Sequence, residues 1–169
     1  MMKAAVIRWA VPRDWLELGS LQARCYHDAY RGLLPNAFLE RVTADGRQTD
    51  CRSLLQEHPE HIAMLCIGDR AAGYISLRFS IEALRGEGEI TALYLLREYW
   101  GRGLGKRMMG WGLERLRERG CAWAGLWVLE KNVNARRFYE GQGFQLDGKE
   151  RVVMRGDPFI QLRYEKEIG

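Results

Sequence analysis

The sequence predicts a mixed α/β protein, and its central third supports this most directly. Residues 90–96 form an apolar run typical of a strand, and a glycine-rich stretch then leads into a helical pattern that starts near Gly103. Residues 121–129 are apolar throughout, as in a strand buried on both faces within a parallel pairing. A short helix and another strand follow. This alternation indicates a right-handed crossover at the centre of the fold.

The first third of the chain predicts one strand followed by helices. Residues 4–9 are the strand candidate, and residues 11–14 interrupt it and open a helix. The apolar side chains of that helix recur close to a 3.6-residue period, at Trp15, Leu18, Leu21, Cys25 and Ala29. We expect a short helix at residues 37–42 and another at residues 48–58.

Turn residues and periodicity predict the remaining elements. A turn at residues 68–70 separates two strand candidates, residues 61–67 and 72–81. A second turn, at residues 85–88, precedes the central strand, residues 89–95. The later elements are helices at residues 103–119 and 132–140, and terminal strands at residues 144–154 and 159–166.

The composition is typical of a globular protein. The chain has 169 residues, of which 47% are hydrophobic and 28% charged, and we expect residues 1–169 to form one cytoplasmic domain without membrane contact. Its four cysteines are widely spaced and have no histidine cluster nearby, which favours reduced thiols over a disulfide framework or a metal site. The net charge of +4 is mild, so a solvated surface with a phosphate site is favoured over nucleic-acid binding.

Residues 101–106 have the features of a phosphate site. Glycines alternate with other residues, two of them basic, where a strand ends and a helix begins, so main-chain N–H groups and the positive helix end face an incoming anion. The P-loop pattern is absent because Gly105-Lys106 is followed by Arg107 in place of Ser or Thr. The glycine spacing also departs from the dinucleotide-binding pattern. An ordinary glycine-rich turn is the remaining alternative.

A second motif lies one helix and one strand further along the chain. Residues 132–144 read N-x-x-A-x-x-F-Y-E-x-x-G-F, and the loop reads Trp100-x-x-Gly103-x-Gly105. Together they resemble two signatures of the GNAT superfamily of acetyl-CoA-dependent N-acetyltransferases, in which Arg or Gln usually stands at the position of Trp100. The resemblance is sharpest over residues 87–144. It implies a single-domain fold with a twisted, mostly antiparallel central sheet that has one parallel pair at its centre and is flanked by helices.

The resemblance also implies how acetyl-CoA binds. The loop would hold the pyrophosphate through main-chain N–H groups, with added charge from Arg102 and Lys106, although these cations also fit a solvated helix face. The bulged end of the central strand, residues 93–95, would bind the pantetheine arm. Asn132 fits a helix cap, a cofactor contact, or both. The expected cofactor contacts are Leu93, Tyr94, Leu95, Gly101, Arg102, Gly103, Leu104, Gly105, Lys106 and Asn132, and no metal is expected.

Two side chains carry the chemistry that the resemblance implies. A lysine-like amine has a pKa of about 10.4 and is almost wholly protonated at neutral pH, so a general base is useful. Glu89 matches the base carboxylate of several family members, or is a surface glutamate. Tyr139 matches the general acid that protonates the departing thiolate, or packs in the core. Tyr30 is expected to line the acceptor site, which ordinary aromatic packing explains equally well.

These observations predict an acyltransferase that moves an acetyl group from acetyl-CoA to a primary amine of a small molecule or peptide, by direct transfer in a ternary complex. The alternative is a non-catalytic acyl-CoA-binding or regulatory module with the same fold. Glu82, Glu87 and Glu89 can attract a cationic amine or can be plain surface residues, so the acceptor stays open. A homodimer is compatible with the sequence, although no segment specifies one.

Overall fold

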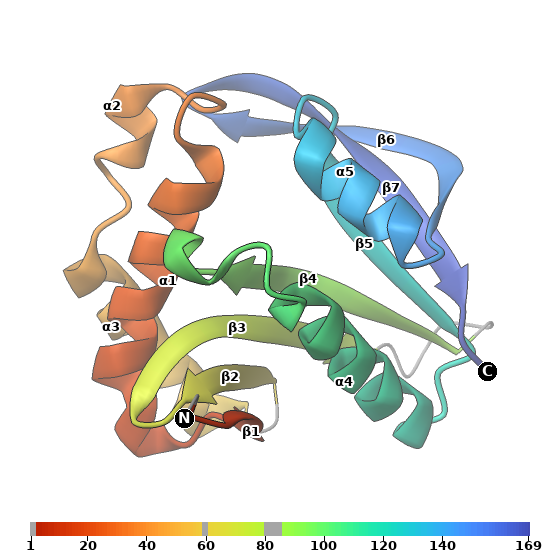
Figure 1. The fold of residues 1–169 in the computed structure, drawn as a ribbon. Coiled ribbons are helices and arrows are strands. Elements are labelled where there is room, and N and C mark those ends of the chain that lie inside the picture. The colour runs from red at the N-terminus through yellow and green to blue at the C-terminus, as the bar shows by residue number, and fades with distance from the viewer. Residues whose placement is uncertain (1–2, 59–60, 80–85) are drawn as a thin grey trace.

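The computed structural model describes residues 3–58, 61–79 and 86–169, which form a seven-stranded sheet in the order β1-β2-β3-β4-β5-β7-β6 (Figure 1). The strands are β1 (Ala5–Trp9), β2 (Ile62–Ile67), β3 (Arg70–Phe79), β4 (Glu87–Leu95), β5 (Trp123–Leu129), β6 (Gln145–Arg155) and β7 (Asp157–Glu167). The helices are η1 (Pro12–Asp14), α1 (Trp15–Tyr30), α2 (Asn36–Leu39), α3 (Ala44–Glu57), η2 (Arg97–Tyr99), α4 (Leu104–Glu118) and α5 (Val133–Gly141). Only the β4–β5 pair is parallel among these neighbours. The predicted fold class is therefore confirmed.

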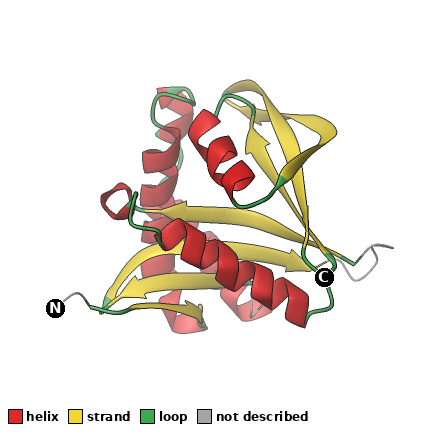
Figure 2. Ribbon diagram, turned by 45° about the vertical axis from the view of Figure 1, so that its right-hand side comes forward, coloured by secondary structure: helices red, strands yellow, loops and turns green. Residues whose placement is uncertain are grey.

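Helices cover both faces of the sheet, and Figure 2 shows α4 in front of the strands and α1 behind them. Adjacent residues of β3 illustrate why. Tyr74 packs in one buried cluster with Leu18 and Cys25 of α1, whereas Ile75 packs in another with Leu113 of α4. Successive side chains of a strand point to opposite faces, so β3 contributes to both clusters. The near-continuous apolar character of the central strands follows from this burial on two sides.

The parallel pair β4–β5 is short, and the two strands then separate. Their register covers three pairs, Glu87↔Trp123, Gly88↔Ala124 and Glu89↔Gly125. Beyond Glu89 the strands diverge towards the N-terminal end of α4, as Figure 1 shows. One edge of β4 therefore lacks a neighbouring strand over most of its length. That edge connects the glycine loop to Glu89.

The β4 bulge lies earlier in the strand than the sequence predicted. The β3–β4 register passes from Ser76↔Ala92 to Leu77↔Ile90, so Thr91 is the extra residue. The predicted position, residues 93–95, pairs regularly with β3. The position at residues 93–95 came from the family resemblance. The strand's own pattern could not correct it, because a two-residue period does not locate a single inserted residue when both faces are apolar.

Several element boundaries also differ from the predictions. The helix expected at residues 48–58 begins at Ala44, because the side chain of Thr43 accepts a hydrogen bond from the Gly46 N–H (3.1 Å) and caps it. β4 begins at Glu87, two residues before the expected start, since Glu87 and Gly88 still pair with β5. The expected end of the third strand, at residues 80–81, and the start of the following turn at residue 85 lie outside the described residues.

Two features that bear on function are not found in the part of the chain that the structure describes. None of its helices is long and apolar enough to cross a membrane. Among the same residues, no group of three or more His, Cys, Asp or Glu side chains gathers as a metal site would. The cytoplasmic location stays a prediction from the sequence.

Candidate active site

The glycine loop ends in a helix N-terminus without a side-chain cap. Gly101 (φ 72°) and Gly103 (φ 76°) adopt left-handed backbone conformations that disfavour other residues, and Gly103 is the N-cap of α4. The first bond of the helix runs from the Arg107 N–H to the Gly103 carbonyl (3.1 Å). The N–H groups of Leu104, Gly105 and Lys106 come before it, so they have no acceptor within the helix. Such an end favours an anion.

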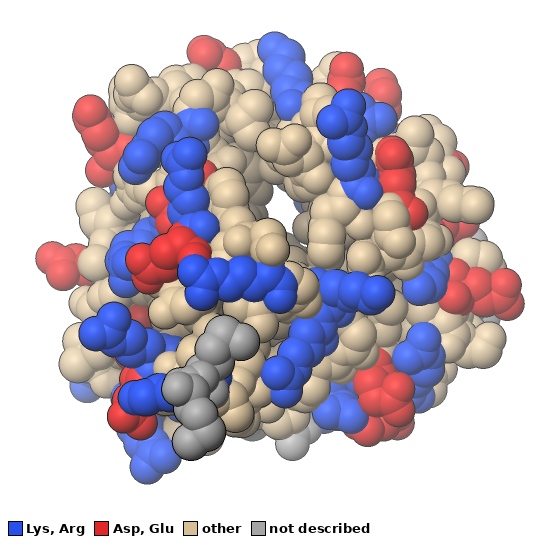
Figure 3. Space-filling view, viewed as in Figure 1, with Lys and Arg blue, Asp and Glu red and all other residues tan. Residues whose placement is uncertain are grey.

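Side chains around the loop add positive charge to this helix end. Arg102 and Lys106 are exposed, and the Arg102 guanidinium lies over the Tyr99 ring, 5.5 Å from its centroid. Figure 3 shows an opening through the molecule, with Lys and Arg side chains gathered below it. The two sequence motifs meet nearby, because a Cβ at Gly105 would lie 3.4 Å from the Phe138 ring of α5. The free N–H groups and the nearby cations are compatible with a diphosphate, whose binding here stays a prediction.

Trp100 anchors the loop to the end of the central strand. Its indole Nε1–H donates a hydrogen bond to the Leu95 carbonyl (2.9 Å), and the Arg97 guanidinium lies 5.9 Å from the centroid of its ring. An arginine or glutamine at this position would place a flexible polar side chain at the loop. The only N–H group of the Trp100 side chain instead bonds to the protein, which leaves phosphate binding to the main chain and the neighbouring cations.

The free edge of β4 presents main-chain groups to the gap. The Leu96 N–H donates to the Ala72 carbonyl of β3 (2.9 Å). The main-chain N–H and carbonyl groups of successive residues in an antiparallel strand point alternately to one side and the other. Those of Leu93 and Leu95 therefore point away from β3, towards β5. Since β5 has already diverged, the Leu93 groups and the Leu95 N–H can bond to an extended ligand arm, whereas the Leu95 carbonyl already accepts the hydrogen bond from Trp100. The main-chain role predicted for residues 93–95 therefore fits the structure even though the bulge lies elsewhere.

Three tyrosines from three elements gather beside this gap. The hydroxyl groups of Tyr30 (α1) and Tyr94 (β4) lie 2.6 Å apart, and their ring centroids 6.0 Å. Tyr139 (α5) is near enough for Tyr30 to raise the pKa of Tyr139 and for Tyr139 to raise the pKa of Tyr94. The structure thus brings together the predicted acid, the predicted acceptor-lining residue and a predicted cofactor-contact residue.

The hydroxyl of Tyr139 remains protonated over the whole neutral range. Burial raises the pKa of Tyr139 above its usual value near 10, and the neighbouring Tyr30 raises it further. The ring packs edge-on against Phe138 and Phe144, with centroids 5.4 and 6.2 Å away. Packing fixes the ring, and the high pKa keeps the hydroxyl neutral. The residue is therefore suited to donate a hydrogen bond to a sulfur that develops negative charge.

Glu89 lies at the opposite end of the free edge and lines a cavity of about 200 Å³. Tyr30 and Tyr94 line the same cavity. One oxygen of the Glu89 carboxylate, Oε2, forms an ion pair with Nη1 of Arg78 on the neighbouring strand (3.2 Å). The side chain is about 25% exposed, so it is neither a plain surface glutamate nor fully buried.

Asn132 has the cap position that its residue type suggests. Its side-chain oxygen accepts a hydrogen bond from the Ala135 N–H (3.3 Å) at the start of α5. The amide nitrogen is not used in that bond. Capping is therefore compatible with the predicted cofactor contact.

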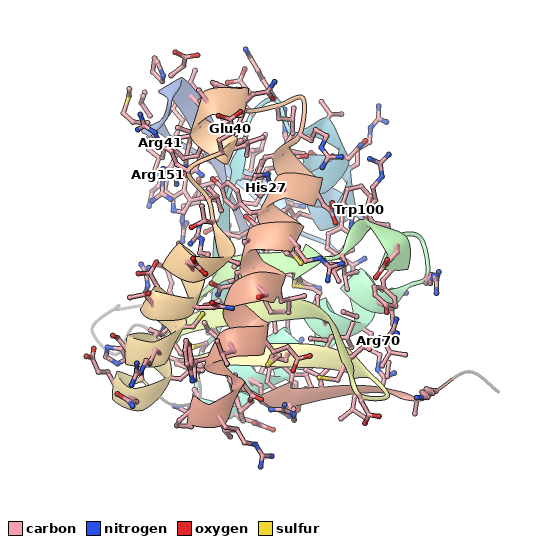
Figure 4. The ribbon with its side chains drawn as sticks, turned by 90° about the vertical axis from the view of Figure 1, so that its left-hand side faces the viewer. His27, Glu40, Arg41, Arg70, Trp100 and Arg151 are labelled. Carbon is pink, nitrogen blue, oxygen red and sulfur yellow. The ribbon has the colours of Figure 1, made fainter. Side chains whose placement is uncertain are left out.

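Sequence reasoning missed the wall of the cavity that β5, β6 and β7 supply. This wall includes Trp127, Leu129, Arg151, Arg155 and Gln161. The turn at Gly156 is a signal that could have found part of it. Residues equally distant from Gly156 face each other in the hairpin, as Arg155↔Asp157 and Arg151↔Gln161 do. Figure 4 shows Arg151 and Trp100 on opposite sides of the molecule in that view.

Comparisons with known proteins agree with this geometry. Residues 15–144 match the acetyltransferase (GNAT) family, and the chain belongs to that family. An uncharacterized N-acetyltransferase of Archaeoglobus fulgidus is 33% identical over 126 residues, which cover 70% of this chain and 81% of that protein.

Solved structures share the fold over nearly the whole chain. The PaiA N-acetyltransferase of Thermoplasma acidophilum, in complex with coenzyme A, superposes with a TM-score of 0.73 at 19% identity and covers 97% of this chain and 99% of its own. YncA of Salmonella typhimurium, solved with its cofactor acetyl-CoA, has a TM-score of 0.70 at 16% identity and covers 98% and 95%. At these identities the likeness concerns the fold.

Proposed function

We propose that the protein transfers an acetyl group from acetyl-CoA to a primary amine within a ternary complex. The observation that carries the proposal is the free edge of β4, which has an anion-binding helix end at one end and the Glu89 carboxylate at the other. Family membership and the coenzyme-bound neighbours support acetyl-CoA as the donor. Acetyl-CoA supplies an acetyl thioester, whose C–S bond breaks as the C–N bond to the amine forms.

Glu89 is the proposed proton acceptor. An amine must lose a proton to attack, and Glu89 lines the cavity in which the amine would lie. The ion pair with Arg78 fixes the orientation of the carboxylate through one oxygen. The other oxygen is available to take the proton from the attacking nitrogen, directly or through one water molecule.

Tyr139 is the proposed donor to the leaving sulfur. Its raised pKa keeps it protonated, and the hydroxyl stabilises the developing thiolate by a hydrogen bond as the C–S bond breaks. When the thiolate takes the Tyr139 proton, solvent returns a proton to the Tyr139 oxygen. This mechanism needs no acyl-enzyme, because the amine nitrogen attacks the thioester itself.

Thiol release from acetyl-CoA, measured with a panel of primary amines, tests the function. We expect release that depends on the acceptor and a fall in kcat of about 10²-fold or more for Glu89→Gln, since a positioned general base contributes about 10²–10⁴-fold. Mass spectrometry of the product should show one added acetyl group. Acetyl-CoA binding without turnover for every amine would instead support the non-catalytic module.

The pH dependence of Glu89→Gln distinguishes a general base from a residue with a purely structural role. If Glu89 removes a proton, alkaline conditions that deprotonate the free amine should recover part of the activity of Glu89→Gln. A purely structural role would leave the variant equally impaired at every pH. Acetyl-CoA affinity should be unchanged by the substitution, because Glu89 lies at the other end of β4 from the glycine loop.

A further inference from the structure

The cavity beside Glu89 has an excess of positive charge. Three arginines line it, Arg78 from β3 and Arg151 and Arg155 from β6, against the single carboxylate of Glu89. Three cations and one anion give the lining of this cavity a formal charge of +2. A purely cationic amine would enter against this charge. An amine that also carries an anionic group would be attracted.

Arg151 is held with its guanidinium in a fixed plane. Its Nε–H donates to Oε1 of Gln161, its cross-strand partner (2.7 Å), and the guanidinium lies over the Trp127 ring, 4.3 Å from the centroid. These contacts use the Nε edge and one face. The two terminal nitrogens stay open for the paired N–H···O bonds that guanidinium forms with a carboxylate or phosphate.

The arginines of the cavity act on one another. Burial lowers the pKa of the Arg151 guanidinium and Arg155 and Arg78 lower it further, whereas Glu89 raises it. Over residues 3–58, 61–79 and 86–169, neither Arg151 nor Arg155 has a carboxylate within ion-pair distance. An incoming anion would offset this repulsion without displacing an existing partner.

Two of the acidic residues that the sequence offered for attracting a cationic amine are already paired with arginines. Glu87 forms an ion pair with Arg163 (3.6 Å), and Glu89 with Arg78. Glu82 lies outside the described residues.

We propose that the acceptor is an amine that also bears an oxyanion, a carboxylate or a phosphate-type group, and that Arg151 binds this oxyanion. The proposal rests on the proposed function and names its acceptor class. Glu89 and Arg151 line the same small cavity, so one compact molecule can reach both. The amine would then lie near Glu89 and the tyrosines, and the oxyanion against β6. This arrangement would orient the nitrogen for attack.

Matched acceptors test the proposal. Four primary amines with one carbon skeleton would carry a carboxylate, a phosphonate, a neutral carboxamide or a second amine, and thiol release would give kcat/KM for each. We expect the wild type to favour the oxyanion-bearing acceptors over the carboxamide by about 10- to 100-fold, the value of a paired charged hydrogen bond. The diamine should be the poorest acceptor. The carboxylate and phosphonate arms distinguish the two oxyanion types.

Substitutions assign the preference to Arg151. In Arg151→Gln the advantage of the oxyanion over the carboxamide should fall close to unity, and Arg151→Lys should restore part of it. Arg52→Gln is the matched control, because Arg52 also lies over a tryptophan, Trp15 (5.5 Å), but on α3 and outside the cavity lining. It should keep the full preference.

The outcomes separate this proposal from the proposed function. Turnover with equal rates for all four acceptors, or a preference that survives Arg151→Gln, would overturn the proposal and leave acetyl transfer intact. If no amine is acetylated, the proposed function fails, and calorimetry of the four compounds with the CoA-loaded protein decides the proposal. Tighter binding of the oxyanion-bearing amines, lost in Arg151→Gln, would support it, and equal binding would overturn it.

Discussion

The glycine loop before α4 and the cavity beside Glu89 lie at opposite ends of one free strand edge but use different parts of the chain. The loop offers main-chain N–H groups, and its glycines matter for backbone conformation. The cavity offers side chains from six elements, and its arginines and tyrosines come from four of them. A backbone site suits the constant part of a donor such as a diphosphate. A side-chain site is the part in which specificity for the acceptor can change while the fold stays the same.

The largest expected effect concerns the phenol between these two regions. Tyr139→Phe should lower kcat by about 10²–10⁴-fold, the contribution of a positioned proton donor. The KM for acetyl-CoA should change little, because the loop contacts remain. Steady-state thiol release measures both values. The variant keeps the ring packing against Phe138 and Phe144, so circular dichroism should match the wild type; an unchanged kcat would remove Tyr139 from the mechanism.

A smaller effect is expected for the backbone of the loop. Gly103→Ala places a Cβ on a residue with φ 76°, which costs about 1–2 kcal/mol. If the loop relaxes to relieve this strain, acetyl-CoA binding should weaken about tenfold. Calorimetric titration with acetyl-CoA checks this.

Gly110→Ala is the matched control for that substitution. Gly110 lies inside α4, its φ is not positive, and a Cβ there would meet no atom within 4 Å. Alanine should stabilise the helix by about 0.5–1 kcal/mol and leave acetyl-CoA affinity unchanged. Equal weakening in both variants would show that α4 as a whole, and not the left-handed turn, sets the affinity.

The same difference explains how much the sequence could predict. The glycine loop and the Asn132–Tyr139 segment are each a continuous stretch of sequence. Asn132 has the cap position that its residue type suggested, and the cofactor contacts of both segments stay predictions. Arg78, Trp127 and Arg151 belong to three strands that become neighbours only through sheet register. The Gly156 turn predicts the Arg151–Gln161 pair, but no local pattern marks the point after Glu89 at which β4 and β5 separate. Local patterns therefore predict a donor site, and of the cavity beside Glu89 they predict little beyond Glu89 and Tyr30.

Trp100 offers a sharper test of the loop. In Trp100→Phe the ring remains but the hydrogen bond to the Leu95 carbonyl is lost, which is worth about 0.5–1.5 kcal/mol. The dissociation constant for acetyl-CoA should rise about two- to tenfold. Arg151→Gln, on the cavity side, should leave it unchanged. A larger effect from Arg151→Gln would mean that the two regions do not bind separate parts of the reactants.

The smallest effect is a titration difference on the cavity side. Burial raises the pKa of Tyr30, Tyr94 and Tyr139, so each stays neutral as pH rises past about 10, where an unfolded tyrosine loses its proton. The contribution of these raised pKa values to the free energy of unfolding is fully present below the tyrosine pKa of the unfolded chain. It is lost as pH rises through the pKa values of the folded protein. Tyrosinate absorbance should therefore lag behind the full count of seven tyrosines until circular dichroism reports unfolding.

Tyr139→Phe sharpens that titration into a test of one residue. Because the pKa of Tyr139 is raised, the variant should have about one tyrosine fewer among those that ionise only as the protein unfolds. The number that ionises near pH 10 should stay the same. A fall in that number would mean that the hydroxyl is solvated near pH 10. Tyr139 would then lose its proton in the same alkaline range in which the acceptor amine becomes neutral, and its hydrogen bond to the leaving sulfur would be lost. If Tyr139 titrates late, the amine loses its proton first. There is then a pH range in which the amine is neutral and the Tyr139 hydroxyl is still protonated.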